Sequence, residues 1–237
     1  MLNQYNRIAA GTRAVDRAQF DEGLRAHMLR VYNFMTVGLV ITGLVAFFGA
    51  SSGLPALVYG TPLKWVVMLA PLAFIFVLSW NFHKFSFATL QMLFYAFSAL
   101  MGVSLMYVFL VYTGASIARV FFITASMFAA TSLYGYTTKK DLSKMGSFLF
   151  MGLIGIIIAS IVNIFLGSSA LQFAISVIGV IVFTGLTAWD TQRIKEEYAE
   201  GYGAEANGKL AVMGALGLYL NFINLFQFLL QLLGNRE

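Results

Sequence analysis

The stretch Leu210–Leu233, LAVMGALGLYLNFINLFQFLLQLL, decides the fold. Read as one helix, it carries small and polar residues on a single stripe, because they follow one another at spacings of three, four, three and seven: Gly214, Gly217, Asn221, Asn224 and Gln231. The other faces are apolar. An unpaired amide in hydrocarbon costs several kcal/mol. We therefore expect the other helices to enclose this one.

The rest of the chain predicts an all-α membrane protein, a seven-transmembrane-helix bundle with the last helix central. The 237 residues are 59% hydrophobic and only 11% charged, whereas a soluble domain carries roughly 25% charged residues. A membrane helix needs about 20 mostly apolar residues. Seven stretches meet this requirement: Val31–Ser51, Trp65–Phe82, Thr89–Tyr112, Ala118–Tyr136, Phe148–Leu166, Leu171–Trp189 and Leu210–Leu233. They form one membrane domain, residues 31–234.

Residues 1–30 form a polar tail with five arginines. Its second half repeats Phe20, Leu24 and Met28 at intervals of four, which is typical of an interfacial amphipathic helix; the alternative is a solvated tail leading into the first span. The tail contains no apolar run, so we expect no cleavable signal peptide. A glycine-rich segment near the other end, Gly201–Gly208 (GYGAEANG), is predicted to be a flexible connector.

Basic residues are distributed unevenly between the two predicted sides of the membrane. The side of the N-terminal tail carries 12 of the 15 lysines and arginines, and the other side carries Lys64, Arg119 and Arg236. The positive-inside rule therefore predicts a cytoplasmic N-terminus and a C-terminus outside. Together with the short loops, this favours a multi-pass protein of a bacterial inner membrane.

Composition excludes several classes of function. The chain has no cysteine, and its histidines, His27 and His83, lack the neighbouring carboxylates that a zinc site would need. The net charge of +5 lies in loops rather than on a soluble basic face, so we expect no nucleic-acid binding. An aspartyl intramembrane protease needs two intramembrane aspartates, and only Asp190 qualifies. A rhomboid-type protease needs a histidine inside the bundle. We expect no enzyme activity and no cofactor.

Asp190 is the main candidate functional residue, because a carboxylate within a membrane helix costs about 2.5–3.5 kcal/mol at the centre and less near an end. It is either a gating group that faces the bundle or a helix-end carboxylate satisfied by water and Arg193. Lys84, at the same predicted end of the second span, is its candidate basic partner. Asn221 and Asn224 are either structural hydrogen-bond donors or ion ligands, and His83 is either a titrating group or an interfacial anchor.

Three separated motifs resemble the Bax inhibitor-1 family of transmembrane Bax inhibitor motif proteins. They are Tyr134–Ser143 (YGYTTKKDLS), Ala188–Lys195 (AWDTQRIK) and Ala215–Phe226 (ALGLYLNFINLF). The resemblance implies a seven-helix bundle with a central last helix and a pH-dependent calcium leak. It also implies that Asp190 is the first aspartate of a proton-sharing pair, and it matches Lys84 to the family's basic residue by position.

The chain departs from the family at the second aspartate. The family's LYLDFINLF reads LYLNFINLF here, with Asn221 in the place of the acid. Two carboxylates in contact cannot both ionise cheaply, whereas an asparagine does not titrate and its amide can donate to an ionised Asp190. We therefore expect the pH gating to be weakened or lost.

Two functions follow from these observations. The first is a calcium-leak channel, with Asp190, Asn221, Lys84 and Asn224 along the ion path and calcium as a transient, low-affinity ion. The second is a non-channel membrane regulator that binds another membrane protein, such as a membrane protease or a survival factor, as some family members are described. In both cases the lipid bilayer is the immediate environment of the chain.

Overall fold

The computed structural model describes the backbone of residues 2–236 and the side chains of residues 20–199 and 201–236. Within these residues it contains helices and one isolated β-bridge, between Tyr112 and Arg236, and no strand. The elements are α1 Leu2–Ala50, α2 Leu54–Tyr59, α3 Leu63–Asn81, α4 Phe87–Leu105, α5 Val108–Val111, α6 Gly114–Thr137, α7 Ser143–Leu166, α8 Ser169–Glu197, the 3₁₀ turn η1 Glu200–Tyr202, and α9 Gly203–Leu233. The predicted all-α fold is confirmed.

The predicted number of membrane-spanning segments is also confirmed. Seven segments of the described chain are long and apolar enough to cross a membrane: Phe20–Ala50, Leu63–Asn81, Phe87–Val111, Gly114–Thr137, Ser143–Leu166, Ser169–Glu197 and Gly203–Leu233. Several are longer than the apolar stretches in the sequence. Hydropathy falls where charged residues begin, whereas the backbone hydrogen bonds of a helix continue through them.

Short polar side chains set several of the helix starts. The side chains of Ser86, Thr113 and Ser168 each accept a hydrogen bond from the backbone N–H three residues further on, at the starts of α4, α6 and α8. Gly167, with φ of 59°, ends α7 in the left-handed region that glycine adopts without strain. The short α7–α8 connection therefore reverses the chain within a few residues.

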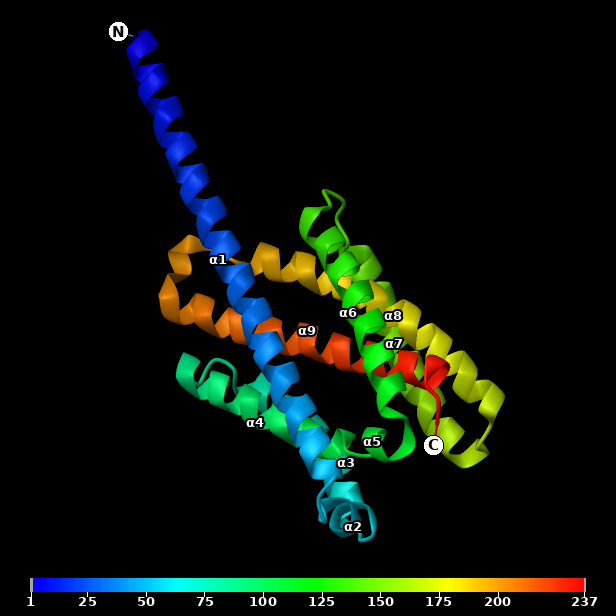
Figure 1. The fold of residues 1–237 in the computed structure, drawn as a ribbon. Coiled ribbons are helices and arrows are strands. Elements are labelled where there is room, and N and C mark those ends of the chain that lie inside the picture. The colour runs from blue at the N-terminus through cyan, green and yellow to red at the C-terminus, as the bar shows by residue number, and fades with distance from the viewer. Residues whose placement is uncertain (1, 237) are drawn as a thin grey trace.

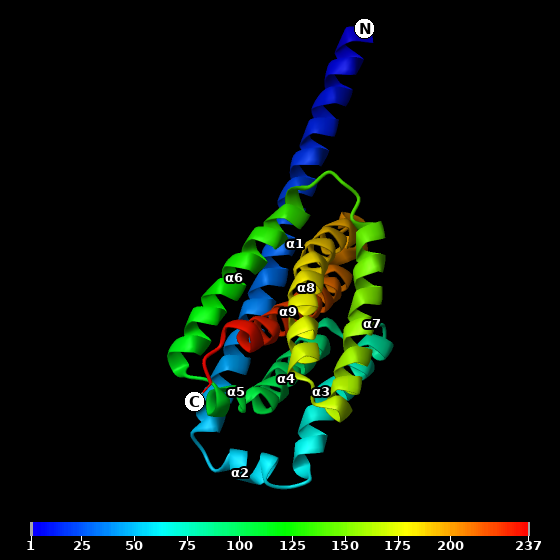
Figure 2. The ribbon, with the colours of Figure 1, turned by 90° about the vertical axis from the view of Figure 1, so that its right-hand side faces the viewer.

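Helix α9 lies at the centre of the bundle, as its polar stripe predicts. It packs against α8, α1, α6 and α4, and Figure 2 shows it enclosed by the other helices. Of the most apolar part of α9, 56% of the residues are buried, against 17–39% in the other six spans. Helices α3 and α7 pack at the edge, against α4 and α8 respectively.

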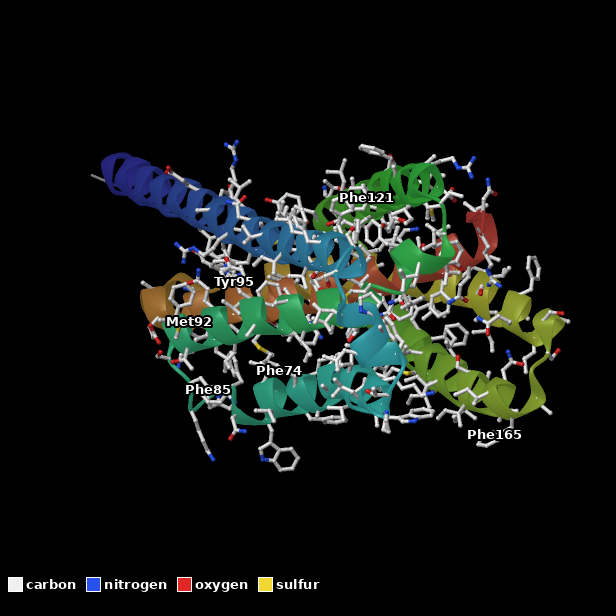
Figure 3. All side chains as sticks on the ribbon, turned by 60° about the horizontal axis from the view of Figure 1, so that its bottom comes forward. Phe74, Phe85, Met92, Tyr95, Phe121 and Phe165 are labelled. Carbon is white, nitrogen blue, oxygen red and sulfur yellow. The ribbon has the colours of Figure 1, made fainter. Side chains whose placement is uncertain are left out.

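The outside of the bundle is apolar, as a surface that faces hydrocarbon must be. The rings of Phe165 on α7 and Trp80 on α3 are each 85% exposed. Figure 3 shows that Phe165 points away from the bundle. These side chains contribute to the lipid-facing surface rather than to the core.

Helix α1 has no break at residue 30, where the sequence suggested a tail followed by a span. It is continuous from Leu2 to Ala50, and its N-terminal turns project beyond the other helices (Figure 1). His27 and Met28 are buried, and the ring of His27 lies 5.2 Å from that of Tyr198. The end of residues 1–30 therefore contacts the bundle, while the side chains of residues 1–19 lie outside the described part.

The prediction of a flexible connector at 201–208 was wrong. Only residues 198–202, which include η1, separate the two neighbouring helices, and α9 begins at Gly203. Glu205 in the first turn of α9 accepts a hydrogen bond from the backbone N–H of Phe87 at 2.7 Å and pairs with Lys209 at 3.9 Å. An acidic residue at a helix N-terminus and a tertiary contact outweigh the low helix propensity of the glycines.

Candidate functional site

Asp190 lies near the end of α8 that leads into η1, at the interface with α9. It is 7% exposed. The side-chain amide Nδ2 of Asn221 donates a hydrogen bond to Asp190 Oδ2 at 2.6 Å. Gly217, one turn before Asn221, faces the same carboxylate, since a Cβ there would lie in ordinary contact with Asp190 Oδ2, at 3.9 Å. The small and polar stripe of α9 thus meets the acidic side chain that directly follows the predicted sixth span.

The second oxygen of this carboxylate is held by Arg193 on the same helix. Arg193 NH2 lies 2.9 Å from Asp190 Oδ1, and Arg193 Nε lies 3.5 Å from Glu197 Oε1. The guanidinium also lies 5.0 Å from the ring of Trp189. Residues spaced three and four apart share one face of a helix. Arg193 therefore bridges two carboxylates at this end of α8.

The structure pairs Asp190 with Arg193 rather than with Lys84. Lys84 is exposed in the α3–α4 connection, and among the described residues it forms no ion pair with Asp190. The adjacent His83 is also exposed, with its ring 4.9 Å from that of Phe82. Arg193 needs no rearrangement between helices to reach the carboxylate, because it lies one turn further along α8.

Asn224 does not join the site. Its Nδ2 donates to the backbone carbonyl of Leu220, one turn back along α9, at 2.8 Å. This contact is that of a structural hydrogen-bond donor, one of the two roles that the sequence suggested for Asn224. Asn221, in contrast, makes the contact with Asp190 that the sequence predicts.

Three residues of α8 next to Asp190 make contacts that were not predicted from the sequence. Thr191 bonds Ser132 of α6 at 2.9 Å. Gln192 donates to the carbonyl of Lys140 and accepts from the N–H of Leu142, each at 2.8 Å. Lys195 Nζ donates to the carbonyl oxygen of Tyr136 at 2.8 Å. The motif AWDTQRIK could have indicated these contacts, because its polar residues fall on several faces of one helix and so can reach several neighbours.

A second polar layer lies further along the same α8–α9 interface, toward the α7–α8 connection. There, Ser176 Oγ lies 2.8 Å from Gln231 Oε1. Between the two layers, the rings of Phe183 and Phe228 stack with centroids 5.8 Å apart. Gly179 packs under the Phe228 ring, since a Cβ there would approach the ring to 2.6 Å. We call Phe183 and Phe228 the aromatic layer. It separates the Asp190–Asn221 pair from the second polar layer.

Comparison with known proteins gives a consistent set of relatives. A family model described as Bax1-I, "Inhibitor of apoptosis-promoting Bax1", matches residues 24–237. Inner membrane protein YbhL of Escherichia coli strain K12 is 49% identical over 219 residues, which cover 91% of this chain and 94% of that protein. The uncharacterized protein RP147 of Rickettsia prowazekii is 50% identical over 219 residues, covering 92% and 93%. An uncharacterized protein of Caulobacter vibrioides is 48% identical over the full length of both chains.

Proposed function

The chain belongs to the Bax inhibitor-1 family, and from that premise we propose that it is a calcium-leak channel of a bacterial inner membrane with Asp190 in its gate. The observation that carries the proposal is the buried Asp190 carboxylate, held by Asn221 across the α8–α9 interface. Ionisable groups inside membrane helices are expensive, and they mark ion pathways more often than packing contacts.

The ion path runs along the α8–α9 interface. Its two polar layers are the Asp190–Asn221 pair and the Ser176–Gln231 contact. The aromatic layer lies between them and would stop a hydrated ion, because hydrophobic constrictions gate by excluding water. The arrangement described here therefore corresponds to a closed state, and opening requires Phe183 and Phe228 to separate.

Arg193 takes the role of the latch in this proposal. Its guanidinium neutralises Asp190, so the carboxylate attracts a cation only after Arg193 moves away. Calcium takes about 6–8 oxygen ligands, far more than one aspartate supplies. The ion therefore passes with low affinity and is not stored.

The leak should depend little on pH. In the family's aspartate pair one proton is shared, whereas here Asn221 supplies an N–H that no change between about pH 6 and 8 removes. The hydrogen bond from Asn221 to Asp190 supports a weak pH dependence. The amide of Asn221 stands where a second carboxyl group would share a proton with Asp190. Loss of the second acid thus removes the proton-sharing switch and leaves the path.

Calcium flux into proteoliposomes tests the channel. Asp190→Ala should change the size of the leak, and Phe228→Ala should raise it severalfold by removing half of the aromatic layer. Phe165→Ala is the matched control, because that ring is 85% exposed and points outward. A native flux no higher than that of empty liposomes would refute the channel. A flux that responds equally to Phe228→Ala and Phe165→Ala would place the path elsewhere.

A membrane regulator that binds another membrane protein is the second candidate. It is supported by the N-terminal turns of α1, which project beyond the other helices (Figure 1). Removing residues 1–19 discriminates the two functions, because His27 and Met28 are already buried in the bundle and should be kept. A regulator loses co-purification of its partner on this truncation, whereas a channel keeps its flux.

A further inference from the structure

A cluster of side-chain amides lies at the end of the bundle formed by the α7–α8 connection and the end of α9. Two cavities of about 390 Å³ and 410 Å³ open beside it, and Gln172, Gln231 and Arg236 line both. We call the pair of cavities the amide vestibule. It lies on the far side of the aromatic layer from Asp190 and is separate from the candidate gate.

The direction of the hydrogen bonds in this cluster is fixed by one backbone group. The N–H of Ser168 can only donate, and it bonds Asn163 Oδ1 at 3.0 Å. Asn163 therefore presents its Nδ2 to Gln172 Oε1 at 3.2 Å, and Gln172 in turn presents its Nε2 to Gln231 Oε1 at 2.6 Å. The amide NH₂ of Gln231 ends this relay, and it has no acceptor among the described residues. Its two N–H groups remain available to the cavities.

The side-chain amide of Gln227 also has an NH₂ group without an acceptor among the described residues. Tyr107 donates its hydroxyl proton to Gln227 Oε1 at 3.2 Å, so the NH₂ of Gln227 also faces the vestibule without an acceptor in the described part of the chain. Arg236 adds a guanidinium, which lies 5.8 Å from the ring of Tyr112. Among the described side chains, those of residues 20–199 and 201–236, it forms no ion pair. The groups left over in the vestibule are thus N–H donors and one cation.

The charged side chains that the structure describes at this end of the bundle are also positive. Lys64, Arg119 and Arg236 belong to it, and among the described residues no aspartate or glutamate does. A metal cation gains no lasting ligands here, because the amide oxygens already accept protein hydrogen bonds and Arg236 repels it, so calcium on the proposed ion path would pass this layer without binding. An anion with several oxygens would instead find both amide NH₂ groups and the guanidinium.

We propose that the amide vestibule binds a compact oxyanion, a carboxylate or a phosphate group, between Gln227, Gln231 and Arg236. Two sources offer this chemistry: a free solute and the headgroup of an anionic lipid. The site shares Gln231 with the second polar layer of the proposed ion path, but anion binding there requires no movement of ions past the aromatic layer, so it can be tested whether or not the leak exists.

Calorimetric titration of the full-length protein tests the site, with inorganic phosphate and succinate as probes and nanodiscs of phosphatidylcholine as the membrane. Gln231→Glu keeps an oxygen for Gln172 and Ser176 to bond while it replaces the donor by a negative charge. Arg236→Gln removes the cation. Each should weaken binding at least about tenfold, which corresponds to about 1.4 kcal/mol. Lys64→Gln is the matched control, since Lys64 is basic, lies at the same end and lines neither cavity.

Each outcome decides the proposal. Saturable binding that Gln231→Glu and Arg236→Gln weaken and Lys64→Gln leaves unchanged supports it. Absence of saturable binding of both probes overturns it, as does equal affinity in the native protein and Gln231→Glu at an unchanged unfolding midpoint. Repeating the phosphate titration in nanodiscs that contain phosphatidylglycerol then separates the two sources. A weaker affinity for phosphate means that the lipid headgroup competes for the site. An unchanged affinity for phosphate assigns the site to a free solute.

Discussion

Gly135 of α6 provides the sharpest test of the packing around the candidate gate. A Cβ at this position would lie 2.8 Å from the carbonyl carbon and 2.9 Å from the Cα of Ala188 in α8, and closer still to the carbonyl oxygen. Ordinary contact begins at 3.4 Å. Gly135→Ala must therefore move α6 and α8 apart by at least about 0.6 Å, because backbone atoms cannot rotate away as a side chain can.

That movement has a calculable effect on the neighbouring contacts. The hydrogen bond between Ser132 and Thr191 would lengthen from 2.9 Å to at least about 3.5 Å, the limit of such a bond, because the carbonyl oxygen of Ala188 demands a larger shift than its carbonyl carbon. Overpacking costs about 1–3 kcal/mol, and an interhelical hydrogen bond in a membrane protein contributes about 0.6 kcal/mol. We expect a loss of about 2–3 kcal/mol, or roughly 4–12 °C in the unfolding midpoint of a chain of this size.

The assay is thermal unfolding in detergent, followed by tryptophan fluorescence, with Gly155→Ala as the control. Gly155 is exposed on α7, and a Cβ there meets nothing within 4 Å. Both substitutions gain the same helix propensity, about 1 kcal/mol, so the difference between them isolates the clash. Equal midpoints for the two variants would refute the close approach of α6 and α8.

Three further predictions concern the core, a connection and the topology. Tyr219→Phe removes a buried hydroxyl 2.6 Å from Thr42 Oγ1, so it should lower the free energy of unfolding by about 0.5–1.5 kcal/mol; an unchanged denaturation midpoint would contradict this. Gln192→Ala breaks both hydrogen bonds to the α6–α7 connection, so amide exchange there should become faster while that of α3 stays the same. Alkaline phosphatase fused to the C-terminus should be active, because the distribution of lysine and arginine predicts a C-terminus outside the cytoplasm; an inactive fusion would contradict this topology, because the enzyme reaches its active form only outside the reducing cytoplasm.

Hydrophobic patterning was sufficient to predict the bundle and its centre. Long apolar stretches mark membrane helices directly, and the polar stripe of α9 has to be enclosed because hydrocarbon offers its amides no partner. Patterning could not separate Asn221 from Asn224. The two residues are less than one turn apart, and only the structure shows that Asn221 bonds Asp190 of α8 while Asn224 donates to Leu220 of its own helix.

Contacts that depend on side-chain reach were harder to predict. Lys84 and Arg193 are both basic residues at the same predicted end, and only the structure places the guanidinium 2.9 Å from Asp190. The glycines of 201–208 indicated a loop, while the tertiary bond of Glu205 favours a helix. The aromatic layer has no pattern of its own in the sequence, since Phe183 and Phe228 are two of 23 phenylalanines.

The most direct test of the account compares calcium flux into proteoliposomes from about pH 6 to pH 8 for the native protein and for Asn221→Asp. The substitution restores two carboxyl groups in contact, at the position where Asn221 Nδ2 now lies 2.6 Å from Asp190 Oδ2. The account predicts a native leak that stays flat across this range and an Asn221→Asp leak that changes steeply. A native leak that already titrates steeply, or an Asn221→Asp leak as flat as the native one, would contradict it.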